Sequence, residues 1–494
     1  MAGRHFRNAS WGGLAAAARA ATGLLGALLA VRLLGVGQYG HVATWLSLFV
    51  LYLSLNSSAF TMVVVKLQAT VGDDNHSERD AAIAAAVRFC LGALTLLGPV
   101  TVALAAYAAR LPLSNGTLPK TFGDAILLMG LLTAIQIVVA LQASVIEGAG
   151  RLDLATKSQL AGPLVIVAGL SCGFLAGASL RLEAYLALLC GGAAVDMALL
   201  WSIRRGLGLP LSASKATAGN SGGVLQLLRS GGLLQATTLL NLFLEPANKF
   251  LLNHFAGSAA VAIYDLAMKV VWGIQHLVGS AMRVFLHIGS EEPAAVGRMF
   301  TTAVALLGVP VVVMHVAGSL FLFWVASYWM TIDAGQLMIF FGIAAISNLG
   351  MIFVTPFYLS LIGGNDLPFI FRTQVVLALV NVLVSSAAIP FIGLIGAALG
   401  LLMATVINAA AIYGRCRIEA TVSSDLEGSI SRVKGRVAIA LALLTATIAW
   451  AAAGGGQPLV LFTIIAGLVA IMTGEPLIGR VMDQFAPRRS RKKA

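Results

Sequence analysis

The chain has 494 residues, of which 59% are hydrophobic and only 11% are charged, and its formal net charge is +12. Soluble domains carry about 25% charged residues, so this composition excludes a water-soluble globular protein and indicates many membrane-spanning segments. The apolar runs are continuous rather than alternating, which excludes an outer-membrane β-barrel.

Hydrophobic runs bounded by glycine, proline and charged residues predict fourteen helices long enough to cross a membrane. In chain order, the predicted spans are 13–34, 41–65, 81–109, 122–146, 155–177, 182–203, 233–255, 259–288, 298–328, 335–361, 369–390, 394–415, 436–453 and 458–478. The expected fold class is therefore an all-α integral membrane protein with about fourteen transmembrane helices.

Two polar connections divide these helices into groups of six, six and two. The expected parts are an N-terminal six-helix lobe at 1–203, a cytoplasmic linker at 204–232, a C-terminal six-helix lobe at 233–415, an additional helix pair at 416–479 and a basic cytoplasmic tail at 480–494.

The two lobes align weakly with each other. At an offset of 222 residues, 34–40 faces 256–262, so that Gly35 faces Gly257. Six helices are an even number, so the lobes would share one orientation. We therefore expect a parallel repeat about a pseudo-twofold axis along the membrane normal, with the substrate path between the halves.

The distribution of lysine and arginine predicts the orientation. With the N-terminus inside, the inner segments hold 23 of these residues and the outer loops hold three, namely Arg110, Lys120 and Arg181. This asymmetry places both termini in the cytoplasm. Because most of the positive charge lies in these inner segments, we expect it to contact anionic lipid of the inner leaflet rather than nucleic acid.

One predicted helix, 259–288, has a polar stripe along its whole length. At about 100° per residue, seven positions fall within an arc of about 80°. They are Asp265, Lys269, Trp272, His276, Ser280, Arg283 and His287. A charged side chain in hydrocarbon costs several kcal/mol, so we expect this stripe to face a bundle interior or a water-filled cavity.

Charged residues within the predicted spans are the candidate cavity residues. The basic ones are Arg19, Arg32, Arg88, Lys249, Lys269 and Arg283, with His276 beside them, and the candidate coupling carboxylates are Glu245 and Asp265. The spacing of i, i+4 allows Glu245 to pair with Lys249 and Asp265 to pair with Lys269, so structural pairing and cargo contact are both open. Arg32 and Arg283 lie near helix ends, where snorkelling to lipid headgroups is the alternative.

Signals for catalysis, cofactors and metals are missing from the sequence. It has no HExxH, Walker or GxSxG motif, and none of its four cysteines forms a CxxC pair. We expect a protein that is not an enzyme and has no cofactor or metal, whose driving force is an ion gradient, the membrane potential or substrate flux.

The segment Arg32-Leu33-Leu34-Gly35-Val36-Gly37-Gln38-Tyr39-Gly40 resembles the start of Wzx-type polysaccharide flippases of the MOP exporter superfamily. Its second-half counterpart runs from Lys249 to Gly257 and from Val261 to Lys269. Two departures are Ala262 in place of the usual glycine, and Glu245 four residues before Lys249 rather than beside it.

The resemblance implies a two-lobed MOP/MATE-like transporter in the bacterial inner membrane. Such a protein flips undecaprenyl-diphosphate-linked oligosaccharides to the outer leaflet by alternating access through a cationic cavity. Its partners would be the lipid-linked substrate, membrane lipid and a polysaccharide polymerase with chain-length machinery. Arg19, Arg88, Lys249, Lys269 and Arg283 would hold the diphosphate and acidic sugars, and Asp265 and Glu245 would tune or release them.

Three other functions remain open at this point. A flippase for the peptidoglycan lipid precursor would also have a basic cavity and fourteen helices. A cation-coupled multidrug exporter of the same superfamily would need an acidic or aromatic cavity. A polysaccharide polymerase or ligase would need a large outer loop, and the longest predicted outer loop has about a dozen residues.

Overall fold

In the residues that it describes, the computed structural model is almost entirely helical. It describes residues 2–69, 76–108, 112–113, 116–117, 121–149, 151–209, 222–291, 311–329, 334–363 and 366–419. By its contacts the chain divides into two compact units, one of Met1–Lys269 with Asn381–Gly393 and the other of Val270–Val380 with Leu394–Ala494.

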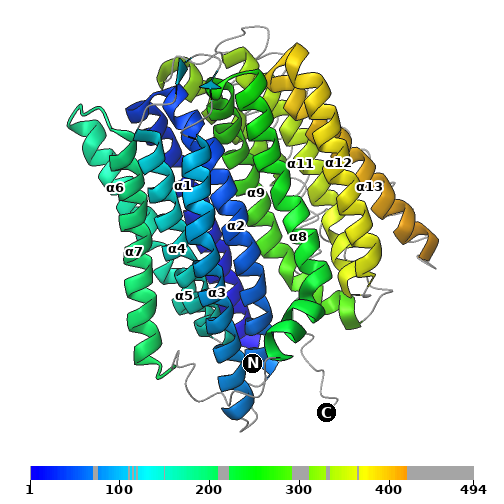
Figure 1. Cartoon of the computed structure of the whole chain (residues 1–494). Coiled ribbons are helices and arrows are strands. Elements are labelled where there is room, and N and C mark those ends of the chain that lie inside the picture. Colours follow the sequence, from blue (N-terminus) through cyan, green and yellow to red (C-terminus); the bar gives the residue numbers. More distant parts are fainter. Residues whose placement is uncertain are drawn as a thin grey trace, which may run out of the picture. The chain divides into compact units, whose positions relative to one another are not determined.

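The first unit holds most of the long helices in the described chain. They are α1 (Ala2–Leu34), α2 (Val36–Ala69), α3 (His76–Ala108), α4 (Thr121–Gly148), α5 (Leu152–Ser158), α6 (Ala161–Leu175), α7 (Leu182–Gly206), α8 (Gly222–Phe255), the first third of α9 (Ser258–Glu291) and the second half of α12 (Leu367–Ile392). Within this unit α2 packs against α4 and α8, and α4 packs against α3 and α7. Figure 1 shows these helices running lengthwise beside one another.

The second unit contains the rest of α9 and of α12. It also holds a helix at 311–324 that ends in a π-helical turn, η2 (Val325–Trp329), and the helices α11 (Ala334–Gly363) and α13 (Leu394–Glu419). Helices α11 and α13 pack along each other, and their contact includes a hydrogen bond of 2.7 Å between the hydroxyls of Ser347 and Thr405.

Most of the predicted spans coincide with helices. The first eight spans and those at 335–361, 369–390 and 394–415 lie on helices, and part of 298–328 is helical at 311–324. The last pair, 436–453 and 458–478, and the tail lie outside the described residues. Ten of the described helices are long and apolar enough to cross a membrane. A two-residue antiparallel pairing, β1 (Pro112–Leu113) with β2 (Gly116–Thr117), lies between α3 and α4.

The fifth span differs from the prediction, because it is not one helix. Helix α5 ends at Ser158 and α6 begins at Ala161. Pro163 explains the break, since its ring removes the backbone N–H that would bond to the carbonyl of Gln159 and clashes with that carbonyl. The N–H of Gly162, buried in the first turn of α6, instead donates to Oδ1 of Asp196 on α7 at 2.7 Å.

The burial pattern differs from that of a soluble protein, because many large apolar side chains are exposed and several polar ones are buried in an otherwise apolar core. Large apolar side chains such as Leu96 and Leu383 are exposed, whereas Asn248, His315 and Asn381 are fully buried. Exposed apolar surface on long helices is stable where lipid is the solvent, and buried amides are stable where they find partners inside the bundle. The protein is therefore a multi-pass membrane protein.

Candidate functional site

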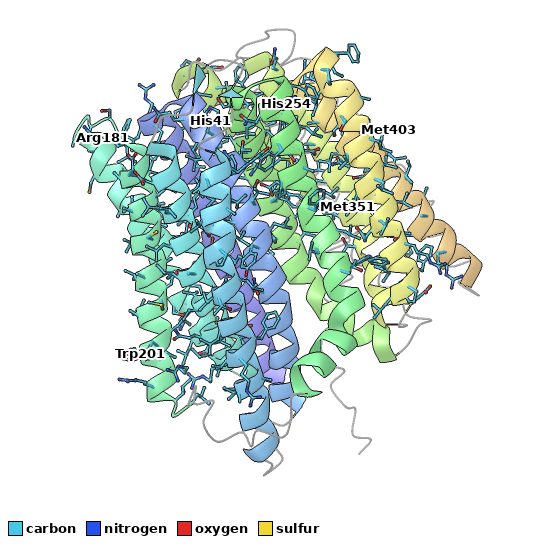
Figure 2. All side chains as sticks on the ribbon, viewed as in Figure 1. His41, Arg181, Trp201, His254, Met351 and Met403 are labelled. Atoms are coloured by element: carbon cyan, nitrogen blue, oxygen red, sulfur yellow. The ribbon has the colours of Figure 1, made fainter. Side chains whose placement is uncertain are left out.

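Two similar helix junctions lie in the first unit and position the candidate site. Gly35 separates α1 from α2 and Gly257 separates α8 from α9, and each has a φ of 86°. Glycine adopts this left-handed conformation without strain, so the first junction needs only Gly35 and the second only Ala256 and Gly257. The two glycines are those that face each other at the sequence offset of 222. His41 and His254, next to the two junctions, lie at the same end of this unit as Arg181 (Figure 2).

Helix α2 and the start of α9 are in direct backbone contact. A Cβ atom on Gly40 would overlap the carbonyl oxygen of Ser258, so the approach requires glycine. Further along, the ring of Trp45 on α2 meets Phe250 on α8 edge to face, with the ring centroids 5.9 Å apart. These contacts hold α2 beside α8 and α9 and bring Tyr39 next to Asp265.

Four charged side chains of α8 and α9 form a network with Tyr39, which we call the Asp265 network. Lys249 Nζ lies 2.5 Å from Glu245 Oε1 and 2.6 Å from Asp265 Oδ1. Lys269 Nζ lies 3.0 Å from Asp265 Oδ2, and the hydroxyl of Tyr39 donates to the same Oδ2 at 2.5 Å. Two ammonium groups balance two carboxylates, which lowers the cost of placing charge in the bundle.

Exposure differs sharply between the members of the Asp265 network. The side chains of Asp265 and Lys249 are 2% and 5% exposed, whereas those of Glu245 and Lys269 are 33% and 36% exposed. The centre of the network is therefore closed, and its two ends are reachable. Both predicted i, i+4 pairs are present, and the structure adds the bond between Lys249 and Asp265 that joins α8 to α9.

A second buried polar cluster adjoins the network. Asn248 and Asn381 exchange amide hydrogen bonds of 3.1 and 3.4 Å, and Asn248 also donates to the hydroxyl of Tyr264 at 3.4 Å. These bonds tie α8 to α9 and to α12. They satisfy amides that would otherwise be costly in the bundle interior.

Along α9 the polar face becomes exposed while the apolar face stays buried. Lys269 is partly exposed and His276 is exposed, whereas Val271, Ile274 and Val278 are buried. The predicted stripe therefore faces away from packed protein at these positions. An exposed charge in hydrocarbon is costly, so exposure of this face is stable only where water reaches it.

Three other predicted cavity residues, Arg19, Arg32 and Arg88, lie on α1 and α3, which contribute no residue to the Asp265 network. Arg19 on α1 is exposed and donates from Nη1 to Oε1 of Gln159 at 3.0 Å, at the break between α5 and α6. Arg32 and Arg88 are exposed on α1 and α3. Arg283 lies on α9, but its side chain is outside the described part of the chain.

Four buried polar residues that bridge helices were not predicted as site residues. Tyr39, Asn248, Asn381 and Asp196 are all buried. Tyr39 belongs to the motif that carries the family resemblance. A polar motif residue between Gly37 and Gly40 could have been predicted as a site residue. Asp196 had the signal of a carboxylate in the middle of an apolar span. Among the described residues no group of three His, Cys, Asp or Glu side chains could hold a metal ion.

Several solved structures share the fold of this chain. The Lipid II flippase MurJ in its inward closed conformation has a TM-score of 0.64 at 11% identity, with 97% of this chain and 98% of that chain covered. An outward-facing multidrug resistance MATE family transporter of the MOP superfamily has a TM-score of 0.59 at 12% identity, with 87% and 96% covered. An inward-facing multidrug resistance MATE family transporter of the MOP superfamily has a TM-score of 0.57 at 14% identity, with 82% of this chain and 96% of that chain covered. The fold is thus that of MOP-superfamily membrane transporters.

The sequence places the chain more narrowly. The family model described as polysaccharide biosynthesis protein matches residues 6–286, which is more than half of the chain. The protein belongs to this family. No functionally curated protein matches the chain in sequence.

Proposed function

We propose that the protein flips an undecaprenyl-diphosphate-linked oligosaccharide from the cytoplasmic to the outer leaflet of the bacterial inner membrane, for the synthesis of a cell-surface polysaccharide. The proposal rests on the polar face of α9, which exposes Lys269 and His276 although the helix spans the membrane. The family supports the link to polysaccharide, and the MOP fold supports transport by alternating access.

The chemistry of the cargo favours basic side chains. A diphosphate carries adjacent negative charges, which guanidinium groups bind bidentately and ammonium groups bind as point charges. We assign cargo contact to the exposed or partly exposed residues Arg19, Arg32, Arg88, Lys269 and His276, and extend the assignment to Arg283 from its place on the same stripe. Glu245 and Asp265 remain the proposed coupling carboxylates.

Lys249 takes a different role in this proposal. It was a predicted cargo residue, but its ammonium group already contacts two carboxylates and is almost fully buried. A diphosphate could reach it only after the network had opened. We therefore assign Lys249 to holding Asp265 and Glu245 in the conformation of this structure.

Flipping can be tested directly in proteoliposomes. The purified protein is reconstituted with fluorescent undecaprenyl-diphosphate-N-acetylglucosamine, and dithionite is added outside to quench the outer-leaflet label. We expect complete quenching with the wild type and a slower phase with Lys269→Gln. The matched control is Arg181→Gln, an exposed cation at the start of α7 outside the proposed site. Quenching no faster than in protein-free liposomes would refute the proposal.

A flippase for the peptidoglycan lipid precursor is the second candidate. The observation that favours it is the structural similarity to the Lipid II flippase MurJ over nearly the full length of both chains. Complementation separates the two candidates. Growth of a strain depleted of its peptidoglycan precursor flippase would support the second, and restored surface polysaccharide in a strain lacking an oligosaccharide flippase would support the first.

A further inference from the structure

The two lysines of the Asp265 network differ in how firmly they are held. Lys249 contacts two carboxylates at 2.5 and 2.6 Å, whereas Lys269 contacts Asp265 at the longer distance of 3.0 Å. The Lys269 side chain is also about seven times more exposed than that of Lys249 (36% against 5%). Lys269 is therefore the ammonium group of the network that can change partners without unpacking the bundle.

The departure of Lys269 would not leave Asp265 without donors. Its Oδ1 atom keeps Lys249, and its Oδ2 atom keeps the hydroxyl of Tyr39. A buried carboxylate oxygen that loses its only donor carries a large desolvation penalty. Tyr39 removes that penalty, because it shares Oδ2 with Lys269 in the structure as it stands.

We propose that Tyr39 is a positioning residue, which holds Asp265 so that Lys269 can exchange the carboxylate for a phosphate oxygen of a diphosphate headgroup. This inference rests on the proposed function and names the exchange by which its site takes up cargo. The carboxylate and the phosphate compete for one ammonium group. The network keeps its remaining bonds when Lys269 leaves, because Lys249 and Tyr39 come from α8 and α2 and do not move with the Lys269 side chain.

Diphosphate recognition also explains why Lys269 is paired at all. An unpaired ammonium group on a membrane helix would be costly when no cargo is bound, and pairing with Asp265 neutralises it. A headgroup with two or more negative charges can outcompete a single carboxylate that already has two other donors. A neutral headgroup cannot displace it, so the exchange selects for charge.

Binding measurements on the purified full-length protein test the exchange. The probes are undecaprenyl diphosphate, undecaprenyl monophosphate, the neutral polyprenol undecaprenol and inorganic pyrophosphate, with affinity measured by microscale thermophoresis in detergent. The variants are Lys269→Gln, Lys269→Arg, Tyr39→Phe and the double variant Tyr39→Phe with Lys269→Gln. Arg181→Gln serves as the control, and a melting curve is recorded for each protein.

We expect Lys269→Gln to weaken undecaprenyl diphosphate binding by about tenfold or more, as the loss of a charge-assisted hydrogen bond predicts. Lys269→Arg should restore most of the affinity. Tyr39→Phe should weaken binding by about tenfold with little change in melting temperature, because both lysines still hold Asp265 in the free protein. In the Lys269→Gln background, Tyr39→Phe should have no further effect on affinity. Inorganic pyrophosphate should compete with the lipid in the wild type.

Several results would overturn the exchange. They are unchanged diphosphate affinity in Lys269→Gln or in Tyr39→Phe, simple additivity of the two effects, equal affinity for a neutral polyprenol, or no competition by pyrophosphate. If the folded wild type binds neither polyprenyl phosphate, the proposed function itself fails. If the wild type binds and flips the lipid but the Tyr39 and Lys269 variants behave like Arg181→Gln, only the exchange fails.

Discussion

The hydroxyl of Tyr39 donates a hydrogen bond of 2.5 Å to Oδ2 of Asp265, a residue 226 positions later in the chain. This bond joins α2, in the first half of the sequence, to α9, in the second. It ends on the same oxygen that Lys269 contacts. The charged residues of the Asp265 network on α9 are thus bonded to α2 through an uncharged side chain, that of Tyr39.

Removal of Lys249 should destabilise the protein far more than removal of Lys269. Lys249→Met leaves the buried carboxylate of Asp265 without its Oδ1 partner, and breaking a buried ion pair costs about 3–5 kcal/mol. Lys269→Met removes a partly exposed contact and should cost about 1 kcal/mol or less. Thermal unfolding in detergent gives both values, and equal losses would mean that the two lysines are equivalent.

Glycine at position 40 should be required for the contact between α2 and α9. The added methyl group of Gly40→Ala would overlap the carbonyl oxygen of Ser258, so the two helices must separate. We expect a loss of about 1–3 kcal/mol in the free energy of unfolding. The matched control is Gly92→Ala in α3, where a Cβ meets no atom within 4 Å and where alanine favours the helix. A loss of similar size in both variants would argue against the close approach.

The carboxylate of Asp196 should stabilise the start of α6. Asp196→Leu removes the acceptor of the Gly162 N–H, which costs about 1–3 kcal/mol when the donor stays buried. Asp196→Asn keeps an acceptor oxygen at the same place and should cost less. Melting curves of the two variants distinguish hydrogen bonding from charge, because a charge effect alone would make them equally unstable.

The orientation of the chain can be read from the ends of α7. In Figure 2, Arg181 and Trp201 lie near opposite ends of this helix. In a cysteine-free background, Arg181→Cys should react with a membrane-impermeant maleimide in intact cells, and Arg205→Cys should react only after permeabilisation. Both labelling results are expected if the two termini of the chain are cytoplasmic. The reverse pattern would invert the predicted topology.

Much of the fold could be predicted from the sequence. The apolar runs marked helices α1–α4, α7–α9 and α11–α13, because hydrocarbon selects for length and apolarity over some 20 consecutive residues. The break in the fifth span was missed, although Pro163 and Asp196 were both visible in the sequence. A proline inside a helix can either kink it or break it. The structure shows a break, with α5 ending at Ser158 and α6 beginning at Ala161, where the Gly162 N–H bonds to Asp196.

By itself, the sequence determined the membrane class, the positions of most helices, the polar stripe of α9 and the i, i+4 spacing that allows two ion pairs. These features depend on local composition and on helical periodicity, which a single chain segment already contains. Only the tertiary structure decided that Lys249 reaches Asp265 and that Tyr39 shares the Asp265 carboxylate with Lys269. Those contacts cross between helices, and they depend on how closely α2 packs on α9 where Gly40 meets Ser258.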